Sequence, residues 1–145
     1  MSAAPVLVEQ VVQARLFVTT HRTAALRVTL HYRSDDPLAV RMFFPAEFSL
    51  DGEALPEAPA EVEWVFARWL LAAGLDAPNG VGDVHVRPTA GGRTMVELRS
   101  AEGVALVRFE AADLRRFLFE SYLAVPEERE TLLLDADRAL AELLG

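Results

Sequence analysis

Apolar and polar side chains alternate strictly along residues 26–33. Leu26, Val28, Leu30 and Tyr32 occupy the even positions, and arginine, threonine and histidine occupy the odd ones. A period of two is typical of an antiparallel strand with one face buried and the other in solvent. The pattern therefore predicts a strand whose even positions face the core.

The same period, or a dense run of Val, Leu and Phe, recurs along much of the chain as far as residue 110. It predicts strands at residues 8–18, 39–44, 61–66, 84–88, 94–99 and 104–110, and leaves room for a short strand near Phe48. Turn-forming residues separate these segments, including Pro37, residues 77–80 and the Gly91-Gly92 pair. Trp64 shares a face with Val62 and Phe66, so we expect its side chain in the core.

Helical spacing is found in three places. Residues 67–73 predict a short helix that ends at Gly74. Residues 111–123 bring Leu114, Phe117, Leu118 and Ser121 to one face, and the last segment spaces Leu133, Ala136, Leu140 and Leu144 as one stripe. Strands, a short helix, more strands and two helices predict an α+β fold, with a largely antiparallel sheet of about seven strands covered by about three helices. The 145 residues contain no repeat or linker, so we expect a single domain, 1–145.

Composition narrows the classes of function. The chain has no cysteine, which excludes disulfides, thiol nucleophiles and cysteine-ligated metals and suits a reducing cytoplasm. Its first residues lack a signal-peptide pattern, and no apolar run approaches the roughly 20 residues of a membrane span. We therefore expect a cytoplasmic protein without a transmembrane segment. The formal charge of −8 disfavours nucleic acid at long range.

Few residues form a pattern that could support catalysis. Asp83 and His85 would share a strand face and, with Asp76, could ligate a metal, although no second histidine has ligand spacing. Gly80-Val81-Gly82 precedes a strand, whereas a phosphate-binding loop must precede a helix. We therefore expect no catalytic residue, metal or cofactor, and a protein that is not an enzyme.

Four basic side chains predict an alternative binding surface. Arg15, Arg27, His31 and Arg41 fall on the outer faces of neighbouring predicted strands, with Phe17 or Phe43 nearby. A basic strip with aromatic neighbours on a sheet is a means of binding single-stranded nucleic acid. The other interpretation is an ordinary solvated face, which the net charge favours.

Large apolar residues outside the predicted core are more informative. Phe119 and Leu123 point away from the stripe formed by Leu114 and its neighbours, and Trp69 cannot face the same core as both residues that follow it. Exposed apolar groups of this size often mark contacts between proteins. We therefore expect Phe119, Leu123 and Trp69 to contact a partner or a second copy, unless the C-terminal helix folds back over the first two.

Three blocks of sequence resemble a known family. They are residues 36–40 (DPLAV), 62–71 (VEWVFARWLL) and 82–88 (GDVHVRP). In this order and spacing they resemble the SsgA-like protein family of actinobacteria, and the middle block is most similar to the SsgB-like branch. The similarity covers about residues 10–144. This chain has Trp69 where the family usually has an acidic residue.

The resemblance implies a role in sporulation-specific cell division. SsgB-like proteins help to position the tubulin-like GTPase FtsZ at future septa, and SsgA-like paralogues help to place the SsgB-like proteins. The family has no known catalytic residues. Its fold resembles that of the Whirly proteins, which bind single-stranded DNA, and its members are expected to form homotrimers. The resemblance thus implies FtsZ, an SsgA-like paralogue and further copies of the chain as partners, at division septum sites.

Overall fold

The computed structural model describes residues 4–45 and 61–144 and contains eight strands and three helices over these residues. The strands are β1 (Leu7–Phe17), β2 (Thr23–Arg33), β3 (Ala39–Pro45), β4 (Glu61–Ala67), β5 (Asn79–Val81), β6 (Val84–Thr89), β7 (Arg93–Ser100) and β8 (Gly103–Glu110). The helices are α1 (Arg68–Asp76), α2 (Ala111–Ala124) and α3 (Glu127–Leu144). The predicted α+β class is confirmed, with one strand more than the seven expected. The possible strand near Phe48 lies outside the described residues.

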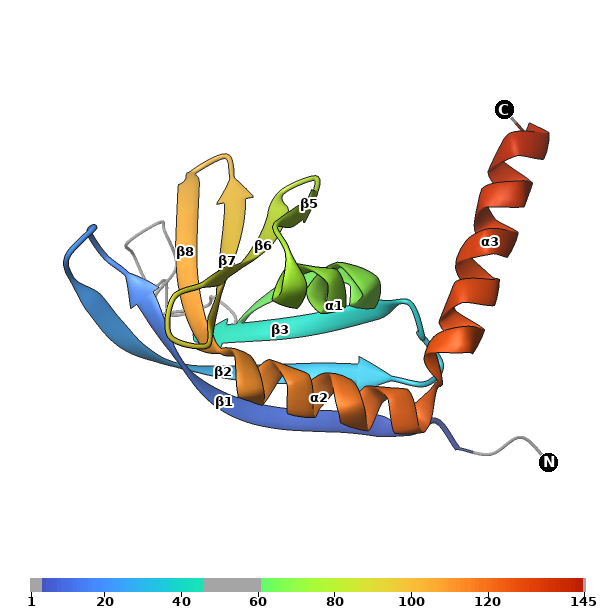
Figure 1. Ribbon diagram of the computed structural model, residues 1–145, viewed down its shortest axis with the longest axis horizontal. Helices are drawn as coiled ribbons and strands as arrows, with labels where there is room; N and C mark the ends of the chain where they lie inside the picture. Colours follow the sequence, from blue (N-terminus) through green and yellow to red (C-terminus); the bar gives the residue numbers. More distant parts are fainter. Residues whose placement is uncertain (1–3, 46–60, 145) are drawn as a thin grey trace.

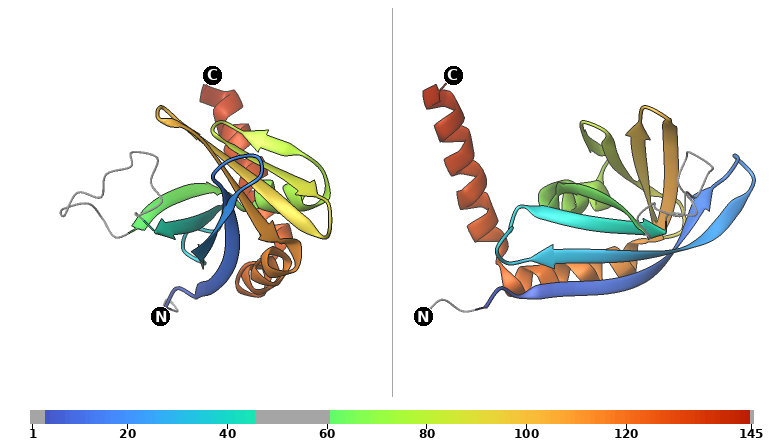
Figure 2. Two further views of the ribbon diagram at one scale, coloured as in Figure 1. Left: turned by 90° about the vertical axis from the view of Figure 1, so that its left-hand side faces the viewer. Right: turned by 180° about the vertical axis from the view of Figure 1, so that it is seen from behind.

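All eight strands form one antiparallel sheet in the order β4-β3-β2-β1-β8-β7-β6-β5. Each half is a meander of consecutive strands, and β1 joins the halves by pairing with β8, where Ala14 faces Phe109. The sheet is strongly curled, as the two views of Figure 2 show, and α1 and α2 lie on its inner side.

The core lies between this inner side and the two helices. The even positions of β2 are buried as predicted, from Leu26 to Tyr32, and so is the α2 stripe of Leu114, Phe117, Leu118 and Ser121. Trp64 is half-buried and packs against the same apolar cluster, in register with the fully buried Met42. Its predicted place on the core face is therefore correct, although part of the ring remains accessible.

The prediction that Gly74 ends the first helix was wrong. Helix α1 continues through Gly74 to Asp76, and the missing side chain at Gly74 lets the helix approach β6 closely. A Cβ atom at Gly74 would lie 2.3 Å from Cβ of Val86. The segment after the helix, predicted as a turn at residues 77–80, contains β5, which pairs with β6.

The prediction that all the helices cover the sheet was also wrong. Helix α3 leaves the end of α2 and projects away from the sheet (Figure 1). Over the described length of α3, Glu130 alone is buried, and Leu140 and Leu144 of the predicted stripe are 56% and 81% exposed. Among the described residues, no helix has the length and apolarity needed to cross a bilayer.

Candidate protein-interaction surface

The outer side of α2 presents large apolar side chains to solvent. Phe119 is 61% exposed and Leu123 is 66% exposed, whereas Leu114 and Phe117 on the opposite side of the helix are fully buried. The alternative in which the C-terminal helix covers them is wrong, because α3 points away from this surface (Figure 1). Both side chains are free for contact with another molecule.

A depression flanks each of these two residues. Phe119 borders a groove between α1 and α2, whose apolar lining includes Ala72, Leu75 and Tyr122. Leu123 borders a second depression between α2 and the start of β1, where Val6 and Leu7 are also exposed. The outer side of α2 thus protrudes between two depressions with partly apolar linings. Side chains of a partner could enter the depression on either side of it.

Trp69 extends this surface onto α1. Leu70 and Leu71 are fully buried, so the helix turns Trp69 outward, where it is 36% exposed. Ala72, which lines the α1–α2 groove, lies three residues further on and therefore shares the Trp69 side of the helix. The three residues predicted as contacts thus lie exposed on two neighbouring helices. Phe119 lines the α1–α2 groove, Leu123 lines the depression beside β1, and Trp69 lies on α1 one turn before Ala72.

A buried arginine holds these helices in place. Arg68, the first residue of α1, has no exposed surface, and its guanidinium lies between the rings of Tyr32 and Tyr122 at 4.7 and 4.6 Å from their centroids. Its Nη1 nitrogen donates hydrogen bonds to the carbonyl oxygens of Ser121 at 3.1 Å and Val125 at 2.9 Å. These contacts tie α1 to β2 and to the C-terminal end of α2.

The same arginine anchors α3. Its Nε nitrogen donates to the carboxylate of Glu130, which is 3% exposed. Charge-assisted hydrogen bonds of this kind are stronger than neutral ones, and an arginine between aromatic faces gains a further attraction. Burial in this cluster raises the pKa of Tyr32 from its ordinary value near 10 to about 12. The ion pair thus fixes the start of α3 and the direction in which the helix leaves the body.

Sequence reasoning did not identify Arg68 or Glu130. A lone arginine after a strand and one acid among several in a helix both have the pattern of solvated residues. The sequence features that could have indicated a buried arginine are Tyr32 and Tyr122, because a guanidinium packs favourably against aromatic rings. Nothing in the spacing of the sequence indicates that both tyrosines meet Arg68.

The four residues of the predicted basic strip do share the outer face of the sheet. His31 is the register partner of Arg41 across β2 and β3, and Arg27 lies four residues before His31 on the same side. Arg15 lies further along β1, opposite Arg108 of β8. The structure therefore brings the strip onto one surface, and it adds an arginine that the sequence analysis did not select.

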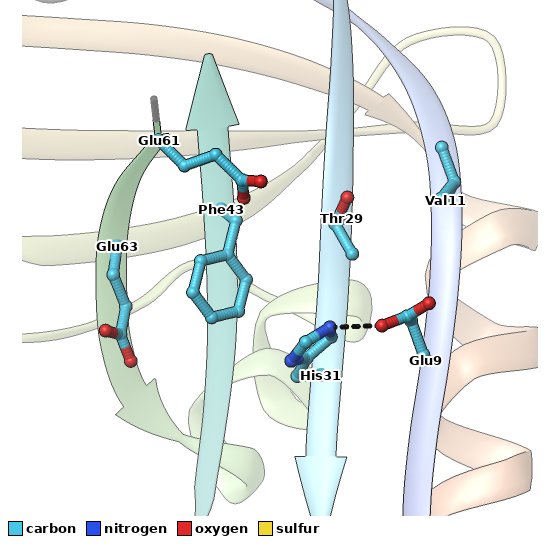
Figure 3. Close-up of a pocket in the computed structure, with 7 residues that line it drawn as sticks. All are labelled: Glu9, Val11, Thr29, His31, Phe43, Glu61 and Glu63. Atoms are coloured by element: carbon cyan, nitrogen blue, oxygen red, sulfur yellow. Dashed lines mark hydrogen bonds and ion pairs between the residues drawn. The ribbon is translucent and has the colours of Figure 1, made fainter. Parts of the chain in front are cut away.

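Acidic residues are interleaved with this strip. His31 Nε2 lies 2.7 Å from a carboxylate oxygen of Glu9 (Figure 3). Arg41 forms ion pairs with Asp36 at 2.8 Å and Glu63 at 3.0 Å. A shallow depression on this face is lined by Glu9, His31 and Glu63, and also by Glu61 and the ring of Phe43. Two of the four basic residues are thus paired with carboxylates, which lowers the positive potential available to a phosphate backbone.

We expect no micromolar affinity of the chain for single-stranded DNA at about 150 mM salt. The net charge of −8 and the carboxylates beside His31 and Arg41 both oppose phosphate binding. Fluorescence anisotropy with a labelled oligonucleotide over a salt series measures this directly. Tight binding at that salt, abolished in an Arg27→Ala/Arg41→Ala variant, would show instead that the outer face is a nucleic-acid site.

The candidate metal ligands do not form a site. Among residues 4–45 and 61–144, no three histidine or acidic side chains are placed to hold one ion together. Asp76, Asp83 and His85 therefore do not converge. His85 instead packs against Gly80 across the β5–β6 pair, where a Cβ atom on the glycine would lie 2.2 Å from the imidazole Nδ1.

Comparison with known families gives a match over most of the chain. The family model described as Streptomyces sporulation and cell division protein, SsgA, matches residues 26–130. Among curated proteins, sporulation-specific cell division protein SsgB of Salinispora tropica is 40% identical, over 97% of this chain and 95% of its own length. The SsgB protein of Kineococcus radiotolerans is 37% identical, over 92% of this chain and 78% of its own length.

Solved structures show the same fold. A structure of an SsgA-like sporulation-specific cell division protein from Thermobifida fusca superposes with a TM-score of 0.74 at 31% identity, covering 98% of both chains. An SsgB structure from work on mutations that correlate with longitudinal cell division during sporulation of Streptomyces coelicolor superposes with a TM-score of 0.76 at 34% identity. That match covers 90% of this chain and 96% of the other.

Proposed function

We infer the function from one premise: the chain belongs to the SsgA family of sporulation and cell division proteins. We propose that it acts in septation by binding other proteins and without catalysing a reaction. In this proposal it helps to position the tubulin-like GTPase FtsZ at septum sites in the cytoplasm, together with an SsgA-like paralogue. The working form is a homotrimer of a single-domain chain.

The observation that carries the proposal is the apolar surface formed by Trp69, Phe119 and Leu123. Each of these residues is at least 36% exposed, and Arg115 of α2 lines the same groove as Phe119. An apolar centre with a polar rim is the usual composition of a protein–protein interface. Because Arg68 and the core hold both helices firmly, the surface is available without rearrangement.

Within this surface we assign the FtsZ contact to Trp69. Tryptophan is the residue type most enriched among those that dominate binding energies, because its large ring combines apolar area with an N–H donor. Trp69 lies on α1 and is 36% exposed, while Leu70 and Leu71 beside it are fully buried. A partner matched to this chain would therefore have an apolar pocket at the corresponding place.

Truncation of Trp69 is expected to weaken binding of purified FtsZ from the same organism about tenfold or more, as for a central interface tryptophan. Surface plasmon resonance with immobilised FtsZ measures the affinity of the Trp69→Ala variant. The matched control is Val104→Ala, an exposed apolar residue on β8, at 53% exposure. Equal affinities of the two variants, with both folded by circular dichroism, would contradict the assignment. Absence of binding by the unchanged chain would contradict the proposed function itself.

A further inference from the structure

One side of α3 is apolar and largely exposed. At about 100° per residue, six of its apolar side chains fall within about 120° of the helix surface. We call this set the α3 stripe; it comprises Leu132, Leu133, Ala136, Ala139, Leu140 and Leu143. Leu132, Leu140 and Leu143 are 69%, 56% and 84% exposed, so little of the stripe is covered by the chain's own body. An acid lies on each side of it, Asp135 on one and Asp137 on the other.

The outer side of α2 has the complementary pattern. Ala112, Phe119 and Leu123 follow one another at intervals of seven and four residues and form one exposed line, which we call the α2 ridge. Arg115 and Arg116 lie on opposite sides of the ridge, with side chains 56% and 68% exposed. Each is 3.7 Å from an acid of its own chain, a surface pairing that costs little to exchange.

The two surfaces cannot meet within one chain. Residues 125 and 126 redirect the backbone at the end of α2, and α3 projects away from the ridge (Figures 1 and 2). The buried ion pair between Arg68 and Glu130 holds α3 in that direction. An acid-bordered apolar stripe and an arginine-bordered apolar ridge are therefore both presented to other molecules.

We propose that the α3 stripe of one chain packs along the α2 ridge of a second copy. The inference rests on the proposed use of Phe119 and Leu123 as contact residues, and it names their partner. Apolar side chains are removed from water along the centre, while Asp135 and Asp137 approach the arginines on either side. Opposite charges placed this way favour the correct pairing over others. The contact is head-to-tail, since different surfaces of the two copies meet, and such contacts can close into rings.

The charges also fix the direction of the incoming helix. Glu120 lies near the C-terminal end of the ridge, and Arg129 lies at the start of the α3 stripe. If α3 runs antiparallel to α2 of the second copy, Arg129 meets Glu120 while the aspartates meet Arg115 and Arg116. In a parallel arrangement that keeps the aspartates beside the two arginines, Arg129 would lie before the start of α2 and away from Glu120. The antiparallel arrangement is therefore the one that the sequence of both helices supports.

The experiment measures the mass of the purified chain by sedimentation equilibrium over a concentration series, with no FtsZ present. Two variants each disable one half of the contact, Phe119→Asp on the ridge and Leu140→Asp on the stripe. The control is Val65→Asp on the outer face of the sheet, where Val65 is 50% exposed. Far-ultraviolet circular dichroism and thermal melting establish that each variant is folded.

We expect the unchanged chain and the control to exceed the monomer mass of 16.0 kDa and each of the two disabled variants to be monomeric. An equimolar mixture of the two variants is expected to form a dimer, because one retains an intact stripe and the other an intact ridge. A monomeric unchanged chain, a Leu140→Asp variant with undiminished mass, or a mixture that stays monomeric would each overturn the inference. These outcomes leave the FtsZ measurement with Trp69→Ala unaffected.

Discussion

Replacing Glu130 with alanine is expected to lower the free energy of unfolding by about 3–5 kcal/mol. The substitution leaves the guanidinium of Arg68 fully buried with no carboxylate to balance its charge. The remaining hydrogen bonds, to the carbonyl oxygens of Ser121 and Val125, carry only partial charges. Urea unfolding followed by tryptophan fluorescence measures the loss.

Two further variants separate the ion pair from general effects on α3. Glu128→Ala removes an exposed acid from the same helical turn and is expected to cost at most about 1 kcal/mol, through the helix dipole. In an Arg68→Met/Glu130→Leu variant both charges are gone, and much of the stability is expected to return, because a buried ion pair is often replaceable by apolar side chains. If Glu130→Ala is no less stable than Glu128→Ala, the ion pair does not anchor the helix.

Replacing Gly74 with alanine is expected to destabilise the fold by about 2 kcal/mol or more, although alanine is the better helix former. The new Cβ atom would lie 2.3 Å from both Cβ and Cγ1 of Val86, and 3.0 Å from its carbonyl oxygen. Helix α1 or strand β6 would have to move, and both line the same core. Chemical unfolding gives the free energy, and the sign of the change is sufficient to decide.

Helix propensity by itself predicts the opposite sign, a gain of about 1 kcal/mol for Gly74→Ala. The neighbouring Ala73→Gly variant calibrates that contribution, because it changes propensity at a half-buried position of the same helix. A stabilised Gly74→Ala variant would mean that α1 and β6 are not packed as closely as described. Taken together, the two variants separate backbone preference from packing at the helix–sheet contact.

Periodic segments were predictable from sequence because their burial is decided locally. The even positions of β2 and the α2 stripe around Phe117 are buried as their spacing indicates. Each pattern records which side of one element faces the core. The exposure of Phe119 and Leu123 followed from the same reasoning, since one helix cannot bury residues on opposite sides against a single sheet.

The features that sequence reasoning missed depend on contacts between distant segments. Gly74 has the pattern of a helix end, and only the approach of β6 shows why a helix would continue through it. Strand β5 is three residues long and exists through its pairing with β6. Burial of Arg68 requires Tyr32, Tyr122 and Glu130, which come from three other elements. The spacing of apolar and polar residues within one element does not reveal contacts of this kind between different elements.

The position of α3 shows a different limit. Its leucine stripe was predicted from spacing, and the assumption that the stripe would cover the sheet was wrong. An amphipathic pattern says that one side of a helix avoids water, and it does not say whether the covering surface belongs to the same chain. That distinction came from the direction of α3 in the structure, and the proposed contact with a second copy depends on it.

The order of strands in the sheet also bears on how the protein emerges from the ribosome. Strands β1 to β4 can pair with one another as soon as they are made, but the second neighbour of β1 is β8, with Ala14 opposite Phe109. Until β8 has been synthesised, β1 is an open edge able to pair with another nascent chain. Pairing of β1 with β8 brings together residues that are far apart in the sequence, and it is therefore slower than formation of a hairpin between consecutive strands. We therefore expect the folding of this chain to be completed only after translation has passed α2, and incomplete chains to depend on chaperones.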